Sequence, residues 1–384
     1  MKTPVYLDYA ATTPCDPRVA DVLMKHLTLE GNFANPASRS HMYGWQAEAA
    51  VEKARKQVAK LLNADVREIV WTSGATEANN LAIKGAYQAS LAKGRHIISS
   101  AAEHKAVLDS LHYLVTEGCE LTLLKPDASG AVSAEQVEAA IRPDTVLISL
   151  MHVNNETGAI TDVQKIASLA QAHGILMHID AAQSAGKIPL DVQQIQADMI
   201  SVCAHKIYGP KGIGALFVRR KPNFILPAQI HGGGHERGMR SGTLATHQIA
   251  AMGEAFEIAH QAQAEEFKHL QNLKKLFLSQ VLKHPRVQIN GLIETSVPGI
   301  VNLTFTDIDG QVLLSALPML AVSSGSACNS ATVSPSHVLT SMGVPERQAL
   351  SALRFSFGRF TDQTQVDFAA ESLLNVLNKL SPAA

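Results

Sequence analysis

The feature that most constrains the fold is a regular alternation of short apolar segments and amphipathic helical segments between about residues 68 and 218. The apolar segments are rich in Ile, Val and Leu; they are EIVWTS, HIISSA, TVLISLM, ILMHID, DMISVCAH and GIGALFV. Strands that alternate with helices are joined by crossover connections, so the alternation predicts a mostly parallel sheet covered by helices on both faces. Functional side chains are then expected in the loops that leave the carboxyl ends of the strands.

The pattern changes after the glycine-rich segment HGGGHERGMRSGT. A long helical pattern covers roughly 244–283, and shorter elements follow, including GIVNLTF, a helix near 309–317, ALRFSFG and a last helix from Asp362 to about Leu380. This second block predicts a smaller α+β domain. The extended segment before Cys15 is compatible with packing on either part.

Composition limits the classes of function. Of the 384 residues, 46% are hydrophobic and 17% are charged, and the formal net charge is −1. The chain therefore lacks the basic excess of proteins that bind nucleic acids or anionic membranes. No apolar run approaches the ~20 residues of a membrane span, and the start, MKTPVYLDYAATTP, does not resemble a targeting segment. We expect a cytoplasmic protein with no direct nucleic-acid or membrane partner.

The four cysteines, Cys15, Cys119, Cys203 and Cys328, are far apart in the sequence. Without a C-x-x-C pair, neither a zinc site nor a dithiol redox motif is predicted, and a disulfide framework is not expected in a reducing compartment. Cys328 stands out because it lies in VSSGSACNSA, a segment of small residues that is unlike a core strand.

A lysine and a carboxylate follow two of the predicted strands. Lys206 comes after DMISVCAH and Asp180 ends ILMHID, with Gln183 three residues later. Pyridoxal phosphate needs both groups, a lysine that binds its aldehyde and an acid beside its ring nitrogen. The alternatives are a lysine that extends into solvent and an aspartate that caps the next helix.

A phosphate site and an aromatic contact are also predicted at strand ends. In TSGATEANN, residues 73–76 stand between a strand and a helix, where free backbone N–H groups attract an anion, although Thr72 or Ser73 could simply cap that helix. His104 begins the following helix and could stack on a flat ring or exchange protons, but it could also be incidental among sixteen histidines. Neither a Walker A motif nor an ordered G-x-G-x-x-G is present.

Several longer blocks make the chain resemble a known family. YLDYAATTP, NPASRSH, TSGATEANNLAIKG, EHKAVL, HVNNETG, CAHKIYGPKG, GGGHERGMRSGT, SSGSAC and RFSFGR are similar to the group I cysteine desulfurases of the IscS/NifS type, over essentially the whole chain. The resemblance implies a fold-type I pyridoxal-phosphate transferase of the α/β class and a homodimer. It also implies a large cofactor-binding domain over 16–262 and a small domain formed by 1–15 and 263–384.

The resemblance assigns roles to individual residues of this chain. The implied cofactor contacts are Ala75, Thr76, His104, Asp180, Gln183, Cys203, His205, Lys206 and Thr243. Lys206 would bind the cofactor covalently and act in catalysis with His104. Asp180 would pair with the ring nitrogen and Gln183 would bond the ring hydroxyl. Thr243 would reach the phosphate from the other subunit.

The same resemblance implies the reaction. Asn155 and Arg354 would hold the carboxylate of L-cysteine, the arginine through its bidentate fork. Cys328 would take the sulfur as a persulfide, leaving L-alanine, and its pliable loop would carry that sulfur to an acceptor. The implied acceptors are an iron–sulfur scaffold protein and, as a further option, the tRNA thiolation machinery. No stable metal site is expected, with Cys328 at most a transient iron–sulfur ligand through its persulfide.

This chain departs from the family pattern in three places. The family usually has serine where this chain has Cys203 and threonine where it has Ala182. A thiol is a weaker hydrogen-bond donor than a hydroxyl, so we expect cofactor binding with some loss of affinity. Longer family members continue past the last helix with a tail that helps to dock the scaffold protein, whereas this sequence ends at LNKLSPAA, which leaves its acceptor open.

Two other functions remain to be distinguished. Another fold-type I activity, such as an aminotransferase or a selenocysteine lyase, would explain Lys206 and Asp180 but not SSGSAC. A non-catalytic sulfur-relay or assembly subunit would explain the fold but not the full set of catalytic side chains. Alanine and sulfide produced from cysteine, without any 2-oxo acid, would separate the desulfurase from both.

Overall fold

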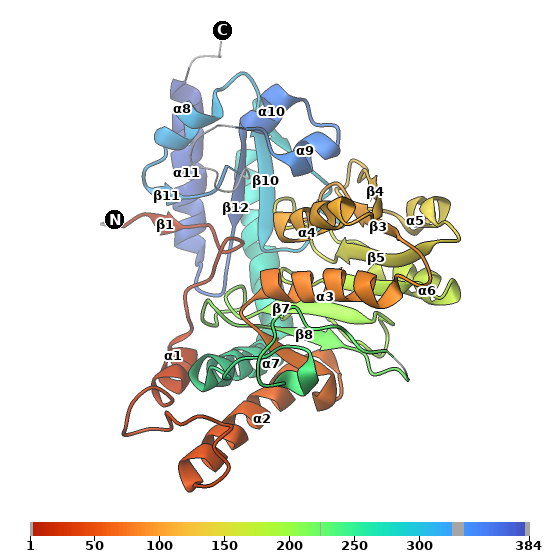
Figure 1. The fold of residues 1–384 in the computed structure, drawn as a ribbon. Coiled ribbons are helices and arrows are strands. Elements are labelled where there is room, and N and C mark those ends of the chain that lie inside the picture. The colour runs from red at the N-terminus through yellow and green to blue at the C-terminus, as the bar shows by residue number, and fades with distance from the viewer. Residues whose placement is uncertain (1–2, 223, 325–333, 381–384) are drawn as a thin grey trace.

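The computed structural model describes residues 3–222, 224–324 and 334–380, and Cys328 therefore lies outside the described residues (Figure 1). The chain forms a large part around a seven-stranded sheet and a smaller part around a three-stranded sheet (Figure 1). Within the described ranges, no helix is long and apolar enough to cross a membrane.

The large sheet has the strand order β2-β8-β7-β6-β5-β3-β4. Neighbouring strands from β7 to β4 are parallel, whereas β8 is antiparallel to both β7 and β2. Its strands are β2 (Ile69–Thr72), β3 (His96–Ser100), β4 (Glu120–Leu124), β5 (Thr145–Met151), β6 (Leu176–Asp180), β7 (Met199–Cys203) and β8 (Gly214–Val218). The predicted mostly parallel sheet is confirmed, and the edge strand β4 is an addition that the apolar pattern did not reveal.

Helices cover both faces of this sheet because alternate strand residues point to opposite sides. Ile69 and Trp71 belong to one apolar cluster, while Val70 between them belongs to another. The helices on the first face are α2 (Met42–Leu62), α6 (Val163–Ala172) and the first half of α7 (Thr246–Val281). Those on the second face are α3 (Ala75–Ser90) and α4 (Lys105–Thr116).

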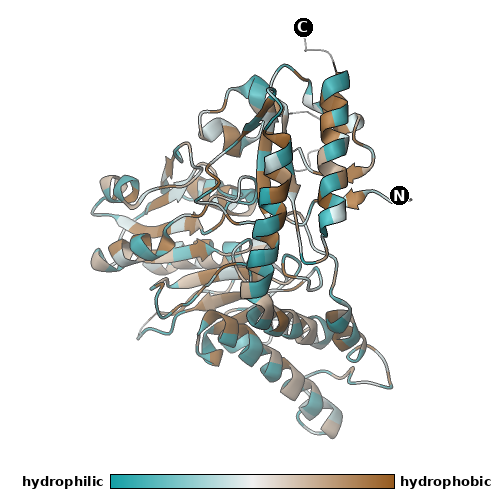
Figure 2. Cartoon of the chain, turned by 180° about the vertical axis from the view of Figure 1, so that it is seen from behind, coloured by the Kyte–Doolittle hydropathy of each residue, from teal (hydrophilic) through white to brown (hydrophobic). Residues whose placement is uncertain are grey.

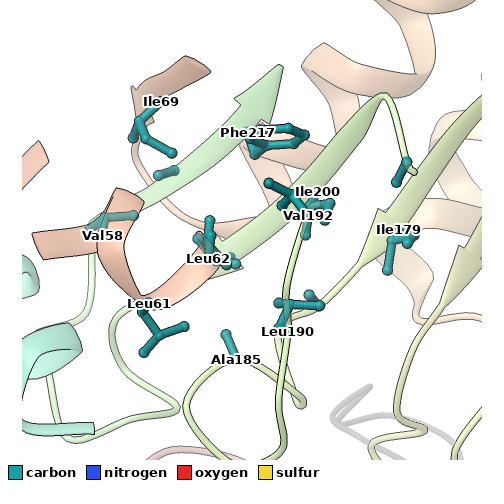
Figure 3. Close-up of a cluster of buried hydrophobic side chains, with 14 of the residues drawn as sticks. Val58, Leu61, Leu62, Ile69, Ile179, Ala185, Leu190, Val192, Ile200 and Phe217 are labelled. Carbon is teal, nitrogen blue, oxygen red and sulfur yellow. The ribbon is translucent and has the colours of Figure 1, made fainter. Parts of the chain in front are cut away.

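The close-up of the first cluster shows the end of α2 lying against the sheet (Figure 3). Leu62 of α2 points toward Ile200 and Phe217 of the sheet (Figure 3), and all three side chains are completely buried. The remaining elements of the large part are α1 (Pro17–Met24), α5 (Ala134–Ala140), and the short 3-10 turns η1 (Val66–Glu68) and η2 (Glu236–Gly238).

Helix α7 joins the two parts. Its residues up to Ala259 belong to the core of the large part, whereas those from Leu270 onward belong to the core of the small part. Seen from behind, α7 and α11 present alternating apolar and polar stripes, as expected of helices buried on one side (Figure 2).

The small part combines an antiparallel sheet, β12-β10-β9, with a parallel pair, β1-β11. Its elements are β1 (Val5–Tyr6), β9 (Val287–Ile289), β10 (Ile300–Phe305), α8 (Gly310–Ser315), β11 (Leu320–Ala321), α9 (His337–Ser341), α10 (Glu346–Leu350), β12 (Ala352–Ser356) and α11 (Gln363–Lys379). Val5 and Leu7 lie in its core, while Ala10 packs with residues of both parts. The N-terminal segment, left open by the sequence, thus begins in the small part and then crosses to the large one.

Candidate active site

A cavity of about 530 Å³ lies at the carboxyl ends of the parallel strands and reaches the small part at Arg354 of β12. Most of the predicted site residues line it; they are Ala75, Thr76, His104, Asn155, Asp180, Gln183, Cys203, His205, Lys206 and Arg354. Thr243 is exposed and is not part of this lining, and Cys328 lies outside the described residues. Residues far apart in the sequence are therefore gathered around one space.

Two adjacent strands place Asp180 and Lys206 at the same end of the sheet. Asp180 is the last residue of β6 and lies opposite Ser201 of β7, and Lys206 follows β7 by three residues. One carboxylate oxygen of Asp180 accepts the Ala182 backbone N–H at 2.9 Å, and the other accepts the Asn79 amide at 2.8 Å. The aspartate does bond the start of the next segment, yet it also faces the cavity.

Lys206 does not extend into solvent. Its Nζ donates to the backbone carbonyls of Ala10 and Ala11, each at 2.6 Å. Burial is the main cause of a lowered pKa at Lys206. Since an ammonium is costly to bury, the site favours the neutral amine more than water does, and that is the form in which a lysine attacks an aldehyde or removes a proton.

The first turn of α3 has the properties of an anion site. The turn begins at Ala75, and the preceding Gly74 provides no side-chain cap, so the alternative of capping by Thr72 or Ser73 does not occur. Of the N–H groups predicted to be free, that of Ser73 instead donates to the Glu77 carboxylate at 2.8 Å. Gly74 has φ 156°, a conformation that favours glycine, and a Cβ there would meet nothing within 4 Å. The N–H groups and dipole of this helix are directed toward the cavity edge, where a phosphate would be stabilised.

Cys203 and His205 line the same cavity at the end of β7; Cys203 pairs with Gly214, whose backbone lies close to Gly74 of this turn. Burial, the largest influence, raises the pKa of the Cys203 thiol to about 11, so the thiol is neutral near pH 7. Burial also lowers the pKa of His205 to about 4, and its ring contacts the Thr12 hydroxyl at 3.2 Å. His104 lines the cavity, and its ring caps α4 by accepting a hydrogen bond from the Ala106 N–H at 3.1 Å.

Arg354 is held in place while part of its guanidinium stays available. One terminal nitrogen donates to the Asn155 carbonyl at 2.9 Å, and the other pairs with Asp8 at 2.7 Å. The Nε of Arg354 is buried without a hydrogen-bond partner among the described residues, as are Oδ1 of Asn155 and Oδ1 of Asn79. All three residues line the cavity. Unpaired buried polar groups are rare, so this lining fits a ligand that offers an anionic group to the guanidinium and hydrogen-bond donors to the two amide oxygens.

The described residues on either side of 325–333 are attached beside this cavity. Ser323 exchanges two backbone hydrogen bonds with Arg354, at 3.2 and 2.7 Å. On the other side, the Ser336 hydroxyl donates to Glu156 at 2.5 Å, and the His337 ring contacts the Glu103 carbonyl at 2.9 Å.

Sequence reasoning missed several contributors to the site. Asp8, the carbonyls of Ala10 and Ala11, and Asn79 all face the cavity or its key side chains. Asp8 and the alanines belong to YLDYAATTP, which carried part of the family resemblance without a role being assigned to it. Asn79 is on α3, one turn after the predicted phosphate site, so helical spacing could have placed it on the same face.

Known proteins match this chain over nearly its whole length. Residues 5–368 match the family described as Aminotransferase class-V. The cysteine desulfurase IscS of Stutzerimonas stutzeri (strain A1501) is 55% identical over 380 residues, covering 99% of this chain and 94% of the relative. The cysteine desulfurase IscS of Pseudomonas entomophila (strain L48) is 56% identical with the same coverage.

Solved structures show the same fold. A NifS-like protein is 34% identical and superimposes with a TM-score of 0.91, covering 98% of this chain and 100% of its own. SspA in complex with cysteine is 38% identical with a TM-score of 0.83, covering 93% and 99%. DndA from Streptomyces lividans is 43% identical with a TM-score of 0.79, covering 92% and 99%.

Proposed function

The chain belongs to the Aminotransferase class-V family and, within it, to the cysteine desulfurases, and from this premise we propose how its own residues carry out that reaction. The enzyme uses pyridoxal 5′-phosphate to convert L-cysteine to L-alanine and transfers the sulfur to a cysteine thiolate. The observation that carries the assignment of roles is the convergence of Lys206, Asp180 and Arg354 on one cavity.

The cavity lining fits the cofactor group by group. Lys206 would hold it covalently, Asp180 would pair with its ring nitrogen, and the uncapped turn at Ala75 would receive its phosphate. The neutral thiol of Cys203 adds a weak donor without repelling the phosphate. When bound, pyridoxal phosphate supplies an electron-accepting ring that makes the carbon–sulfur bond of the substrate breakable.

Two side chains would position the substrate and move its proton. Arg354 would use its unpaired Nε and its fork to bind the cysteine carboxylate, with the Asn155 amide beside it. The Nζ of Lys206 would remove the α-proton, which its lowered pKa favours because the neutral amine is available nearer to pH 7.

Cys328 would be the sulfur acceptor. Its thiolate would attack the substrate sulfur, forming the S–S bond of a persulfide as the carbon–sulfur bond breaks, and the carbon skeleton would leave as alanine after protonation. The attachment of Ser323 to Arg354 and of Ser336 to Glu156 supports this role, since both sides of the segment adjoin the substrate residues. Neither an aminotransferase nor a lyase mechanism explains a thiol at this position.

The experiment is single turnover with cysteine, comparing wild type with Cys328→Ala. Wild type with a reductant should release alanine and sulfide in equal amounts without a 2-oxo acid. In a parallel sample without the reductant, the sulfur should stay on the enzyme, and mass spectrometry should find one added sulfur on the Cys328 peptide. Cys328→Ala should fold and bind the cofactor but release no alanine. Comparable alanine release from the variant, or added sulfur on Cys15, Cys119 or Cys203, would place the nucleophile elsewhere.

We also propose a homodimer. Exposed apolar side chains gather on α1, α2 and the loop between them; they are Met24, Leu27, Leu29, Phe33, Met42, Tyr43 and Trp45. Figure 1 shows this region at the end of the molecule away from the small part. A second copy would cover these side chains and bring its Thr243 to the phosphate, which the exposed position of Thr243 allows. Light scattering should give twice the chain mass, and a monomer would refute the proposal.

The sulfur acceptor and the location are further parts of the proposal. An iron–sulfur scaffold protein is the acceptor that the resemblance of the sequence implies. A cytoplasmic location is consistent with thiols that must stay reduced to accept sulfur. Transfer of labelled sulfur from the enzyme to a purified scaffold protein would test the first point, and no transfer would point to another acceptor.

A further inference from the structure

A second lysine lies behind the site, in the turn that follows β6. The Nζ of Lys187 donates to Oε1 of Gln183 at 2.6 Å, and the other end of that carboxamide, Nε2, donates to the Ala10 carbonyl at 2.7 Å. The same carbonyl accepts the Nζ of Lys206 at 2.6 Å. A continuous series of hydrogen bonds therefore runs from Lys187 through Gln183 and Ala10 to Lys206.

This series determines which way the Gln183 carboxamide points. An amide has one acceptor end and one donor end, and an ammonium group can only donate. When protonated, Lys187 can therefore bond only the oxygen of Gln183, and the Ala10 carbonyl can accept only from the NH₂ group, which then points toward Ala10 and the cavity. Without Lys187, the carboxamide could rotate by half a turn and present its oxygen to the cavity instead.

The surroundings of Lys187 argue against a role in stability alone. Together with Lys206 and Glu266, it lines a separate cavity of about 20 Å³, which has room for roughly one water molecule. Glu266 is bonded to Arg359 at 3.0 Å, and among the described residues Gln183 is the hydrogen-bond partner of Lys187. Burial and the nearby charge of Lys206 lower the pKa of Lys187 to about 7. Lys187 is only partly exposed, and no carboxylate is hydrogen-bonded to it among the described residues. A cation withdrawn from water without such a partner costs stability, which favours a role for Lys187 beyond stability.

We propose that Lys187 is a positioning residue, which holds the Gln183 carboxamide with its NH₂ group directed at the cofactor position beside Lys206. The inference rests on the proposed function, because it assumes that pyridoxal phosphate occupies the cavity. It assigns a task to a side chain that does not line the cavity itself.

The test compares Lys187→Met with Lys274→Met as a matched control. Lys274 is buried where Lys187 is partly exposed, has a pKa lowered by burial to about 8, and donates to Ser296 at 2.6 Å, away from the cofactor cavity. Both variants should change the Tm of the apoprotein. At pH 6.5, only Lys187→Met should also weaken pyridoxal phosphate binding, by about three- to tenfold for one net hydrogen bond, and move the visible absorption band.

A double-mutant cycle decides whether Lys187 acts through Gln183. In a Gln183→Ala background, Lys187→Met should change the cofactor Kd by less than twofold. Lys187→Gln and Lys187→Arg keep a donor and should restore most of the wild-type affinity and band position; they also carry the test if Lys187→Met does not fold.

An unchanged Kd and band in Lys187→Met, or an equal effect in both backgrounds, would overturn the inference. Failure of the proposed function would look different, because the wild-type protein itself would then give neither a visible band with pyridoxal phosphate nor alanine from cysteine.

Discussion

Replacing Cys203 with serine tests the most informative departure of this chain from its family. Cys203 is the last residue of β7, is 2% exposed and lines the cavity at the proposed phosphate position. Its backbone is fixed by pairing with Gly214 of β8, so the substitution exchanges one small side chain for another without moving the strand. The hydroxyl is a stronger donor than the thiol.

The expected gain is modest. A hydrogen bond to a charged group contributes about 1.5–3 kcal/mol, but the existing S–H contact and the smaller volume of serine subtract from it. We expect about 1 kcal/mol in favour of serine, which corresponds to a roughly fivefold lower Kd for pyridoxal phosphate. The thiol is neutral near pH 7, with a pKa raised by burial to about 11, so relief of charge repulsion does not add to the gain.

The assay is equilibrium dialysis of the cofactor against wild type, Cys203→Ser and the control Cys119→Ser. Cys119 is 5% exposed and lies in an apolar cluster with α4 residues, so its replacement should lower stability and leave cofactor binding unchanged. If Cys203→Ser binds the cofactor no more tightly than wild type, the side chain does not face the phosphate and the reasoning fails.

Three further changes probe the rest of the site and the core. Lys206→Ala should abolish the visible absorption of the bound cofactor, and an unchanged spectrum would mean that another lysine holds it. Asp180→Asn should lower kcat far more than it raises KM for cysteine, because the carboxylate acts on charge that develops during reaction; steady-state kinetics would contradict this role if both changed equally. Burial lowers the pKa of His178 from 6.5 to about 4, so about 3 kcal/mol of stability, present above pH 6.5, should be lost as the pH falls toward 4. Urea unfolding of His178→Asn over the same pH range should show a shallower decline, and an equal decline would assign the effect to other groups.

The sequence by itself determined the class of fold and the chemistry of the strand ends. Nearly continuous apolar segments such as TVLISLM, alternating with helical ones, predict a mostly parallel sheet because strands buried on both faces expose few side chains to water. The same pattern predicted that Asp180 and Lys206 both lie at strand ends, since the strands that precede them are both buried and both end in loops.

What the tertiary structure decided depends on contacts between residues far apart in the chain. The strand order that makes β6 and β7 neighbours, and the reversed direction of β8, follow from packing of the whole sheet rather than from any one segment. The sequence likewise assigned no role in the site to the N-terminal segment. In the structure, the Ala10 carbonyl of that segment accepts a hydrogen bond from Lys206, and its Asp8 pairs with Arg354.

Lys187 shows most plainly why its hydrogen-bond partner and its pKa could not be predicted from the sequence. In the sequence it is one lysine after a glycine, a type of residue that is usually solvated. Only the folded chain brings Gln183 and Ala10 between it and Lys206, and there burial, with the charge of Lys206, lowers the pKa of Lys187. Local patterns record which side chains avoid water, whereas hydrogen-bond partners and pKa values depend on which distant groups enclose them.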